Sequence, residues 1–402
     1  MSFPCGGQRI HKNTSVFPQG DLSHAEVQRC GAGGPRSVAA AIDRKSWKRV
    51  RLGDILQVCH GKCQHAIESK TGKYPILATS GEIGRTALYL YDKPSVLIGR
   101  KGTIDKPQYI DSPFWTIDTL FYTKIAEDYN PKFLYYLCLT IDWASMNEAS
   151  GVPSLSANRI ESLEVTIPGV DEQDKIAHTL SSIDTHIATL QSLITKYEAI
   201  KKATVNLLLK PKENWRRVKL GDVCFAFSYG VGASAIPYDG INRYIRITDI
   251  DDDSHEFRPS PLSSPSHFNH DHIVNEGDIL IARTGASVGK SYIYHPNDGK
   301  LVFAGFLIRA AINHDIADPY FIFLQTLTDK YRQWVAEESM RSGQPGLNID
   351  QCKDFEFCIP KMSEQHKIAA QINEIDAVLN NCKKQLDKAQ NLKQGMMSYF
   401  FG

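Results

Sequence analysis

Two copies of one sequence pattern make up most of this chain, and this internal repeat limits the fold more than any other feature. Residues 47–54, Trp-Lys-Arg-Val-Arg-Leu-Gly-Asp, return at 215–222 as Trp-Arg-Arg-Val-Lys-Leu-Gly-Asp, a shift of 215 − 47 = 168. Residues 150–155, Ser-Gly-Val-Pro-Ser-Leu, return at 342–347 as Ser-Gly-Gln-Pro-Gly-Leu, a shift of 342 − 150 = 192. The second copy therefore carries about 24 more residues (192 − 168) in its interior. Such a repeat predicts two related domains with a constant frame and a variable interior.

Each copy closes with a long amphipathic segment, at 171–212 and at 362–402. Apolar residues step by four and three along both segments, which is the heptad pattern of a coiled coil. Asp171 and Ser363 are candidate N-caps, with acid in the first turn. Two seams of equal length and phase favour an antiparallel two-helix coiled coil, and the alternative is two separate core helices that each cover their own domain. The residues predicted to pair are Ile176, Leu180, Ile183, Ile187, Leu190, Ile194, Ile368, Ile372, Ile375, Leu379 and Leu386.

The remaining parts, 45–170 and 213–361, have the pattern of mixed α/β domains with many short strands. Segments such as 96–98 and 279–281 are rich in β-formers and bounded by Gly, Pro or Asp. The expected fold class is α+β: two similar mixed α/β domains separated by two long antiparallel coiled-coil helices. Residues 1–44 hold many Gly and Pro without a sustained period, so we expect a disordered leader and assign it no role.

Composition limits the cellular setting and the partners. The 402 residues hold 46 Lys and Arg against 45 Asp and Glu, so a formal net charge of +1 provides no global basic field. A nucleic-acid partner stays open, because binding needs only a local basic face. No apolar run approaches the roughly 18 residues of a membrane span, and no secretory signal opens the chain. Nine cysteines without tight pairing fit a reducing compartment, so we expect a cytoplasmic protein.

Motifs for catalysis and for metal binding are incomplete. The stretch 285–291 resembles a phosphate-binding loop, but it has three residues between its glycines where four are needed, and a strand-like run follows it. The Cys and His residues at 59–65 have no second pair at zinc-finger spacing, and the histidines at 267–272 are typical of a solvated loop. We therefore expect no catalytic residue and no metal site in this chain.

Polar and basic loops at matching places in both copies are the candidates for nucleic-acid contact. Arg100 and Lys101 stand between Gly99 and Gly102 after a strand-like run, so a tight loop should direct both side chains outward. Arg and Lys neutralise phosphates and can fork onto guanine, and Gln pairs with adenine. Each residue alone is more often a solvated surface group, and the repeated placement is what favours contact. The candidates are Thr79, Ser80, Arg85, Arg100, Lys101, Lys106, Arg246, Thr248, Arg283, Thr284, Lys290, Arg341, Ser342 and Gln344.

In their order, twice over, these motifs resemble the specificity subunit of type I restriction–modification enzymes. The resemblance covers about residues 45–400. It rests on the two Trp-x-x-Val-x-Leu-Gly-Asp openings, the Gly-Arg-Lys-Gly stretch at 99–102, the Ser-Gly-x-Pro-x-Leu stretches, and the helix starts at 167–177 and 359–369. It implies two target-recognition domains that each read one half of a bipartite asymmetric DNA site. The helices would set the spacing and dock two modification subunits, while the leader 1–44 departs from the family pattern.

The resemblance further implies a non-catalytic chain that binds double-stranded DNA and no membrane. S-adenosylmethionine, ATP and Mg²⁺ would belong to partner subunits, namely two modification (methyltransferase) subunits and the restriction (translocase/nuclease) subunits, with no cofactor in this chain. Two alternatives remain open. A self-contained DNA methyltransferase or nuclease would need a cofactor or metal constellation, and a coiled-coil adaptor without DNA specificity would not need two domains with divergent polar interiors.

Overall fold

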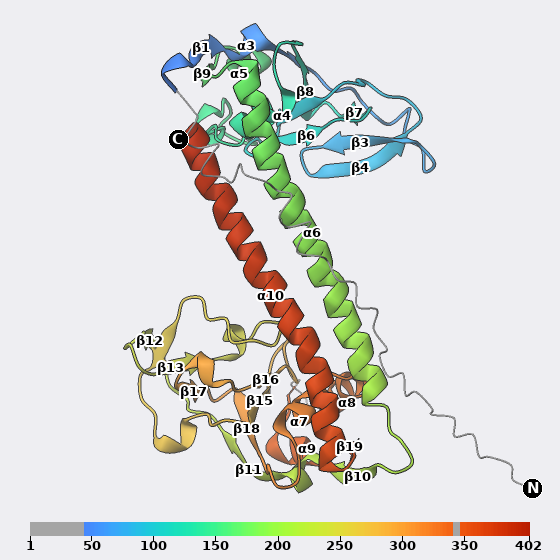
Figure 1. Cartoon of the computed structure of the whole chain (residues 1–402), viewed down its shortest axis with the longest axis vertical. Helices are drawn as coiled ribbons and strands as arrows, with labels where there is room; N and C mark the ends of the chain where they lie inside the picture. The colour runs from blue at the N-terminus through green and yellow to red at the C-terminus, as the bar shows by residue number, and fades with distance from the viewer. Residues whose placement is uncertain (1–43, 341–345) are drawn as a thin grey trace, which may run out of the picture. The chain divides into compact units, whose positions relative to one another are not determined.

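A computed structural model describes residues 44–340 and 346–402 (Figure 1). They divide into two compact units: unit 1 holds the described residues up to His186 together with residues 389–402, and unit 2 holds the described residues between 187 and 388. The expected leader, apart from its last residue, lies outside the described part of the chain. None of the helices in the described part is long and apolar enough to cross a membrane. Each unit holds one globular domain and part of both long helices.

The first domain, in unit 1, contains a four-stranded antiparallel sheet in the order β2-β8-β5-β6, a three-stranded sheet in the order β4-β3-β7, and the pair β1-β9. The middle strand β5 is buried along its whole length, because its apolar run is covered on both faces. Its strands are β1 (Lys48–Arg51), β2 (Leu56–Cys59), β3 (Tyr74–Ala78), β4 (Gly81–Thr86), β5 (Ser95–Gly99), β6 (Gln108–Ile110), β7 (Trp115–Thr116), β8 (Leu120–Ile125) and β9 (Glu164–Ile167). Its helices are α3 (Leu52–Ile55), α4 (Pro131–Cys138) and α5 (Ala157–Glu161), with short 3-10 turns at η1 (Arg44–Ser46) and η2 (Ala144–Met146).

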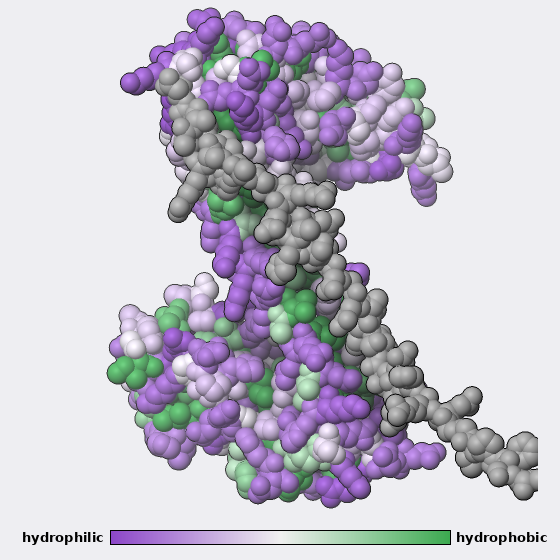
Figure 2. All heavy atoms as spheres, in the orientation of Figure 1, coloured by the Kyte–Doolittle hydropathy of each residue, from purple (hydrophilic) through white to green (hydrophobic). Residues whose placement is uncertain are grey.

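The second domain, in unit 2, contains a four-stranded antiparallel sheet in the order β11-β18-β15-β16 and the pairs β10-β19, β12-β14 and β13-β17. Its strands are β10 (Arg216–Lys219), β11 (Cys224–Tyr229), β12 (Ala235–Pro237), β13 (Arg243–Ile245), β14 (Ser263–Pro265), β15 (Asp278–Ala282), β16 (Ser291–Ile293), β17 (Leu301–Phe303), β18 (Leu307–Ile312) and β19 (Glu356–Ile359). Its helices are α7 (Pro319–Gln325), α8 (Asp329–Ser339) and α9 (Ile349–Asp354), with 3-10 turns at η3 (Leu220–Val223), η4 (Ile247–Asp249), η5 (His270–His272) and η6 (Pro296–Asp298). Figure 2 shows hydrophobic atoms gathered over the region of β12, where Ile236 and Ile241 are exposed.

The two four-stranded sheets share their strand order and their register. Gly99 lies opposite Leu120 across the β5–β8 pair, and Ala282 lies opposite Leu307 across the β15–β18 pair. Gly99 therefore corresponds to Ala282 and Leu120 to Leu307, and the residues next to them in the chain can be matched one by one. The sequence repeat is therefore also a structural repeat.

The long helices are α6 (Val170–Leu208) and α10 (Met362–Phe401). Each begins one residue before its predicted N-cap, Asp171 or Ser363, and that residue lies in the first turn. All of the residues predicted to pair are buried or half-buried on these helices.

The helices pair in both units, and in opposite directions. In unit 1, Leu180 near the start of α6 shares a buried cluster with Phe400 near the end of α10. In unit 2, Val205 near the end of α6 shares a buried cluster with Ile372 near the start of α10. The pairing is antiparallel, and the predicted fold class is confirmed. The start of each helix also lies in the core of its own domain, so the alternative of core helices describes part of the same arrangement.

Equivalent ion pairs join the helices in the two units. In unit 1, Lys393 of α10 lies 2.6 Å from the carboxylate of Asp184 in α6. In unit 2, Lys201 of α6 lies 2.6 Å from the carboxylate of Asp376 in α10. The two lysines are 393 − 201 = 192 residues apart, and so are the two aspartates, 376 − 184 = 192. The same lysine–aspartate ion pair between the helices is therefore present at equivalent positions in the two units.

Candidate nucleic-acid interface

In the first domain, two of the predicted loops meet at the end of β5. The backbone amides of Arg100 and Lys101 donate to the carbonyl of Thr119 at 2.9 and 3.2 Å. The amide of Leu155 donates to the carbonyl of Arg100 at 3.0 Å, and the amide of Gly102 donates to Pro153 at 2.9 Å. The arginine loop is therefore fastened on one side to the turn 117–120 and on the other to the Ser-Gly-x-Pro-x-Leu stretch.

The second domain repeats this arrangement at the end of β15. The amide of Arg283 donates to the carbonyl of Phe306 at 3.0 Å, and the amide of Leu347 donates to the carbonyl of Arg283 at 2.8 Å. Thr284 forms an isolated bridge with Gly346, as Lys101 does with Ser154 in the first domain. We call the meeting of arginine loop, turn and Ser-Gly-x-Pro-x-Leu stretch the arginine junction.

A glycine at the end of the first strand of each sheet completes the junction. A Cβ atom at Gly61 would lie 1.9 Å from the carbonyl oxygen of Ile117, and one at Gly230 would lie 2.3 Å from that of Ala304. Both contacts are too short for any side chain, so only glycine allows the strand to approach the turn this closely. The residues before these glycines are His60 and Tyr229, which both carry rings; the Tyr229 ring contacts Arg283, and the His60 ring packs against Phe121. Sequence reasoning missed them, because the two ring–glycine pairs are 229 − 60 = 169 residues apart and do not align at the shift of 168 that relates the openings before them.

The side chains at the first junction are partly neutralised. The guanidinium of Arg100 donates from Nη1 to the carbonyl of Asp118 at 3.0 Å and lies 3.9 Å from that residue's carboxylate. The Arg100 side chain is 30% exposed and lies against the turn, where Nη1 finds its partner. Lys101 is exposed.

The second junction holds its arginine differently. The guanidinium carbon of Arg283 lies 4.6 Å from the centroid of the Tyr229 ring, a cation–π contact. Within the described residues the buried Nε of Arg283 has no hydrogen-bond partner. The hydroxyl of Tyr229 accepts from the amide of Ile349 at 3.3 Å, which holds the ring in place. No acidic residue stands in the turn 304–307.

The remaining candidates of the first domain lie at different distances from the junction. A Cβ atom at Gly102 would lie 4.0 Å from Oγ1 of Thr79, so the β3–β4 turn approaches the arginine loop, and Ser80 is exposed there. Arg85 binds Glu82 at 3.0 Å at the far end of β4. Lys106 is exposed in the loop before β6.

Two candidates of the second domain brace the fold. Both nitrogens Nε and Nη2 of Arg246 donate to the buried carboxylate of Asp249 at 2.8 Å, and this bond raises the pKa of the guanidinium. The side chain of Lys290 is 9% exposed, and its ammonium donates to the carbonyl of Ile250 and to Asp252, both at 2.7 Å. Both side chains therefore fasten the segment 246–252.

Thr248 is exposed in η4, next to this segment. Arg341, Ser342 and Gln344 lie outside the described residues, although Gly346 and Leu347 place the end of their stretch at the junction.

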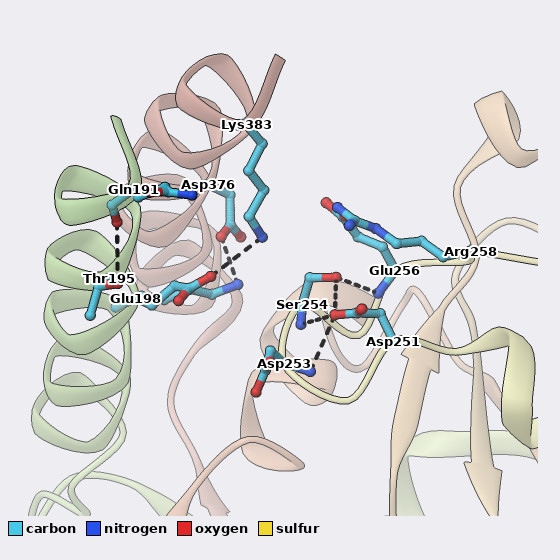
Figure 3. Close-up of polar contacts among 11 residues, drawn as sticks. Gln191, Thr195, Glu198, Asp251, Asp253, Ser254, Glu256, Arg258, Asp376 and Lys383 are labelled. Atoms are coloured by element: carbon cyan, nitrogen blue, oxygen red, sulfur yellow. Dashed lines mark hydrogen bonds and ion pairs between the residues drawn. The ribbon is translucent and has the colours of Figure 1, made fainter. Parts of the chain in front are cut away.

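A separate cavity of about 720 Å³ lies in unit 2, between the long helices and the loop 251–258. Figure 3 shows Asp376, Glu198 and Lys383 on the helix wall, where Lys383 lies 3.5 Å from Glu198. On the loop wall the carboxylate of Asp251 accepts from the hydroxyl of Ser254 at 2.8 Å. Because these charged groups are paired within each wall, the cavity has none of the excess positive charge that phosphate contact requires.

Metal ligands do not gather in the described part of the chain, where no three His, Cys, Asp or Glu side chains could hold one ion. The ring of His60, part of the cluster considered at 59–65, instead packs edge-on against Phe121 at 5.0 Å.

Fold and junction together define a protein with two homologous but chemically different recognition domains carried on paired helices. The sequence matches the type I restriction modification DNA specificity domain over residues 44–199 and again over 212–390. The chain belongs to this family, as a type I restriction–modification specificity subunit with two DNA-recognition domains. The comparisons support neither of the two alternatives, the self-contained enzyme and the adaptor without DNA specificity.

Similar proteins span nearly the whole chain. The EcoDI specificity subunit of Escherichia coli, from a type I restriction enzyme, is 21% identical and the match covers 88% of each chain. The MjaVIII specificity subunit of Methanocaldococcus jannaschii is 20% identical, over 88% of this chain and 92% of that protein. The solved S subunit of a type I system from M. genitalium superposes with a TM-score of 0.66 at 18% identity, over 89% of this chain and 96% of that one. That likeness shows the fold.

Proposed function

We propose that each arginine junction contacts one half of a bipartite, asymmetric DNA site. One observation carries this proposal: the same backbone frame presents different side chains in the two domains. The first junction offers Arg100 beside Asp118, with Lys101 exposed, and the second offers Arg283 on Tyr229. Base edges are read by the pattern of donors, acceptors and apolar atoms set against them, so two different patterns read two different half-sites. Two non-identical readers on one chain suit an asymmetric site better than a palindrome.

The long helices are the proposed dock for two modification subunits. Apolar residues stay exposed at equivalent positions on both: Ile200 and Leu392 are 37% and 43% exposed, and Leu207 and Tyr399 are 72% and 44% exposed. They recur every seven residues (207 − 200 and 399 − 392) outside the buried seam. A heptad-spaced apolar stripe of this kind is how a helix binds another helix. Two equivalent stripes support two copies of the same partner.

The chain itself is proposed to be non-catalytic. S-adenosylmethionine, ATP and Mg²⁺ would then be bound by the modification subunits and by the restriction subunits that complete the complex. The paired helices would also set the distance between the two half-sites on double-stranded DNA.

An exchange of domains tests the reading of half-sites. We expect that replacing residues 47–168 with the matching domain of a related subunit changes one half of the methylated motif and leaves the other half intact. Methylome sequencing of a host that carries the operon reports both halves directly. A motif that changes in both halves, or in neither, would contradict the proposal of two readers.

Charge on the exposed stripe tests the dock. We expect that Leu207→Asp combined with Tyr399→Asp removes the modification subunits from the purified complex. The matched control is Ser192→Asp combined with Lys384→Asp, at equivalent exposed helix positions outside the stripe. Stoichiometric co-purification of the stripe variant would show that the partners bind elsewhere.

A further inference from the structure

Phe306 is a large apolar side chain held out on a rigid turn. Phe306 is 64% exposed, although strand β17 before it is buried and strand β18 after it is mostly buried. The amide of Leu307 donates to the carbonyl of Ala304 at 2.9 Å, and the amide of Gly305 donates to that of Val231 at 2.8 Å. The turn is thus fixed from two sides before any ligand binds. Contact through Phe306 would order little further backbone, which lowers the entropic cost of binding.

The first domain has a different residue at the same place. Leu120 and Leu307 occupy equivalent positions in the two sheets, so the residues before them, Thr119 and Phe306, are also equivalent. The carbonyl of each accepts a hydrogen bond from the backbone amide of its arginine loop. The preceding residue is Asp118 in the first turn and glycine in the second. The second turn therefore has neither the carboxylate that neutralises the arginine in the first domain nor the small polar residue beside it. Phe306 stands there instead, joined to Arg283 by the backbone hydrogen bond from the Arg283 amide to its carbonyl.

We propose that Phe306 is a specificity-determining residue that packs against the C5-methyl group of a thymine, next to the DNA group that Arg283 contacts. This inference rests on the proposed function and adds the chemistry of one base position to it. Among the bases of DNA only thymine presents a methyl group in the major groove, and Phe is one of the side chains that contact it. Cytosine carries only a hydrogen at C5, so Phe306 would have no methyl group to pack against.

Phe225 supplies a matched control for this inference. It is an exposed phenylalanine of the same domain, 68% exposed in β11, with none of its backbone groups in the arginine junction. We expect Phe306→Ser to relax one position of the half-site read by the second domain, from thymine to thymine or cytosine. Phe225→Ser should leave the motif unchanged, and Phe306→Leu should keep the preference for thymine. Methylome sequencing of hosts carrying the complete operon measures all three variants.

A second measurement isolates the methyl group. With duplexes that carry the motif found in that host, replacing the one thymine by deoxyuridine should weaken binding of the assembled complex about fourfold, the effect of one buried methyl group. The Phe306→Ser complex should bind the two duplexes equally. Equal binding by the unsubstituted complex, or an unchanged motif in the Phe306→Ser host, would overturn the inference.

Failure of this inference can be told apart from failure of the proposed function. If only the inference fails, the exchange of residues 47–168 still changes one half of the motif while Phe306→Ser changes nothing. If the proposed function fails, the exchange does not alter one half alone.

Discussion

Two buried glutamines show how single side chains connect the helices to the domains. Gln173 of α6 is 1% exposed, donates to the carbonyl of Pro168 at 2.9 Å and accepts from the amide of Asn130 at 3.0 Å. Gln365 of α10 makes the same two bonds, to Pro360 at 3.0 Å and from Asp318 at 2.9 Å. One amide group thus binds both the entry to a long helix and the cap of the neighbouring short helix.

Removing this amide should destabilise the second unit. Gln365→Leu leaves a buried donor and a buried acceptor without partners, at a cost of about 1–3 kcal/mol for each unsatisfied group. We expect a melting temperature several degrees lower by calorimetry than that of Gln371→Leu, which changes an exposed glutamine of the same helix. Equal melting temperatures would contradict the bonding described for Gln365.

The cysteines differ in burial, and we therefore expect them to differ in reactivity. Burial raises the pKa of the Cys138 thiol to about 12 and that of Cys352 to about 12, so both stay protonated at neutral pH. The thiolate is the reactive form, and Cys63 is exposed. We expect iodoacetamide at pH 8 to modify Cys63 while it leaves the other two intact until the protein unfolds. Peptide mass spectrometry checks this, and early labelling of Cys138 would contradict a closed first core.

The sequence could identify the residues of the junction better than their partners. Its repeat brought Arg100 and Arg283 to equivalent positions, and both lie at junctions. It could not show that Arg246 binds Asp249, since an arginine and an aspartate three residues apart can either form an ion pair or remain two separate, solvated charges. It could not show the partner of Lys290 either, because Asp252 lies 38 residues away in the chain and meets it only when the domain folds.

At the scale of elements, periodicity predicted the helices and their buried seam. The heptad step reports which face is apolar, and that face is the one that packs. The heptad step carries no information on the polar contacts beside the seam. Asp184, for example, accepts a hydrogen bond from the Tyr136 hydroxyl at 2.7 Å and pairs with Lys393. Asp376 accepts from Tyr320 and pairs with Lys201 in the same manner. Only the spacing of 192 residues hinted that these charges are equivalent.

Charge within the seam should separate the helices. Ile183 and Ile375 occupy equivalent, half-buried positions that pack against the cores of the two units. Changing both to Asp places charges among apolar side chains at a cost of several kcal/mol. We expect loss of helical signal on mild heating and loss of the modification subunits on purification.

The control for this prediction is His178→Asp combined with Ala370→Asp, at equivalent exposed positions of the same helices. A seam variant that melts and co-purifies like this control would refute the pairing.

For the whole molecule, the repeat predicted two domains and the helices, but the order of strands was beyond it. Leu56 of β2 pairs with Ile125 of β8, at the opposite end of the domain sequence. Short strands with similar apolar content have many compatible partners, and the choice among them is made by packing. The ring–glycine pairs at Gly61 and Gly230 belong to the same problem, since their tight approach exists only once these strands have paired.

Helix length should set the gap in the recognised motif. One heptad added to both helices at equivalent points, after Gln191 and after Lys383, keeps the seam in phase and adds about 10 Å. At about 3.4 Å per base pair this corresponds to roughly three base pairs. We expect methylome sequencing to report the same two half-sites with a gap about three base pairs longer. Inserting the heptad in one helix alone should abolish methylation, and an unchanged gap in the double insertion would remove the helices from any spacing role.

The backbone frame of the arginine junction affects how DNA recognition can evolve. Main-chain hydrogen bonds and two glycines hold it, so exposed side chains such as that of Phe306 contribute little to the free energy of folding. Substitutions at such surface positions usually change stability by less than about 0.5 kcal/mol. A lineage can therefore exchange the residues of one junction step by step while every intermediate still folds and accumulates. Recognition can drift in one domain independently of the other, and the history of a new motif need not pass through an unstable ancestor.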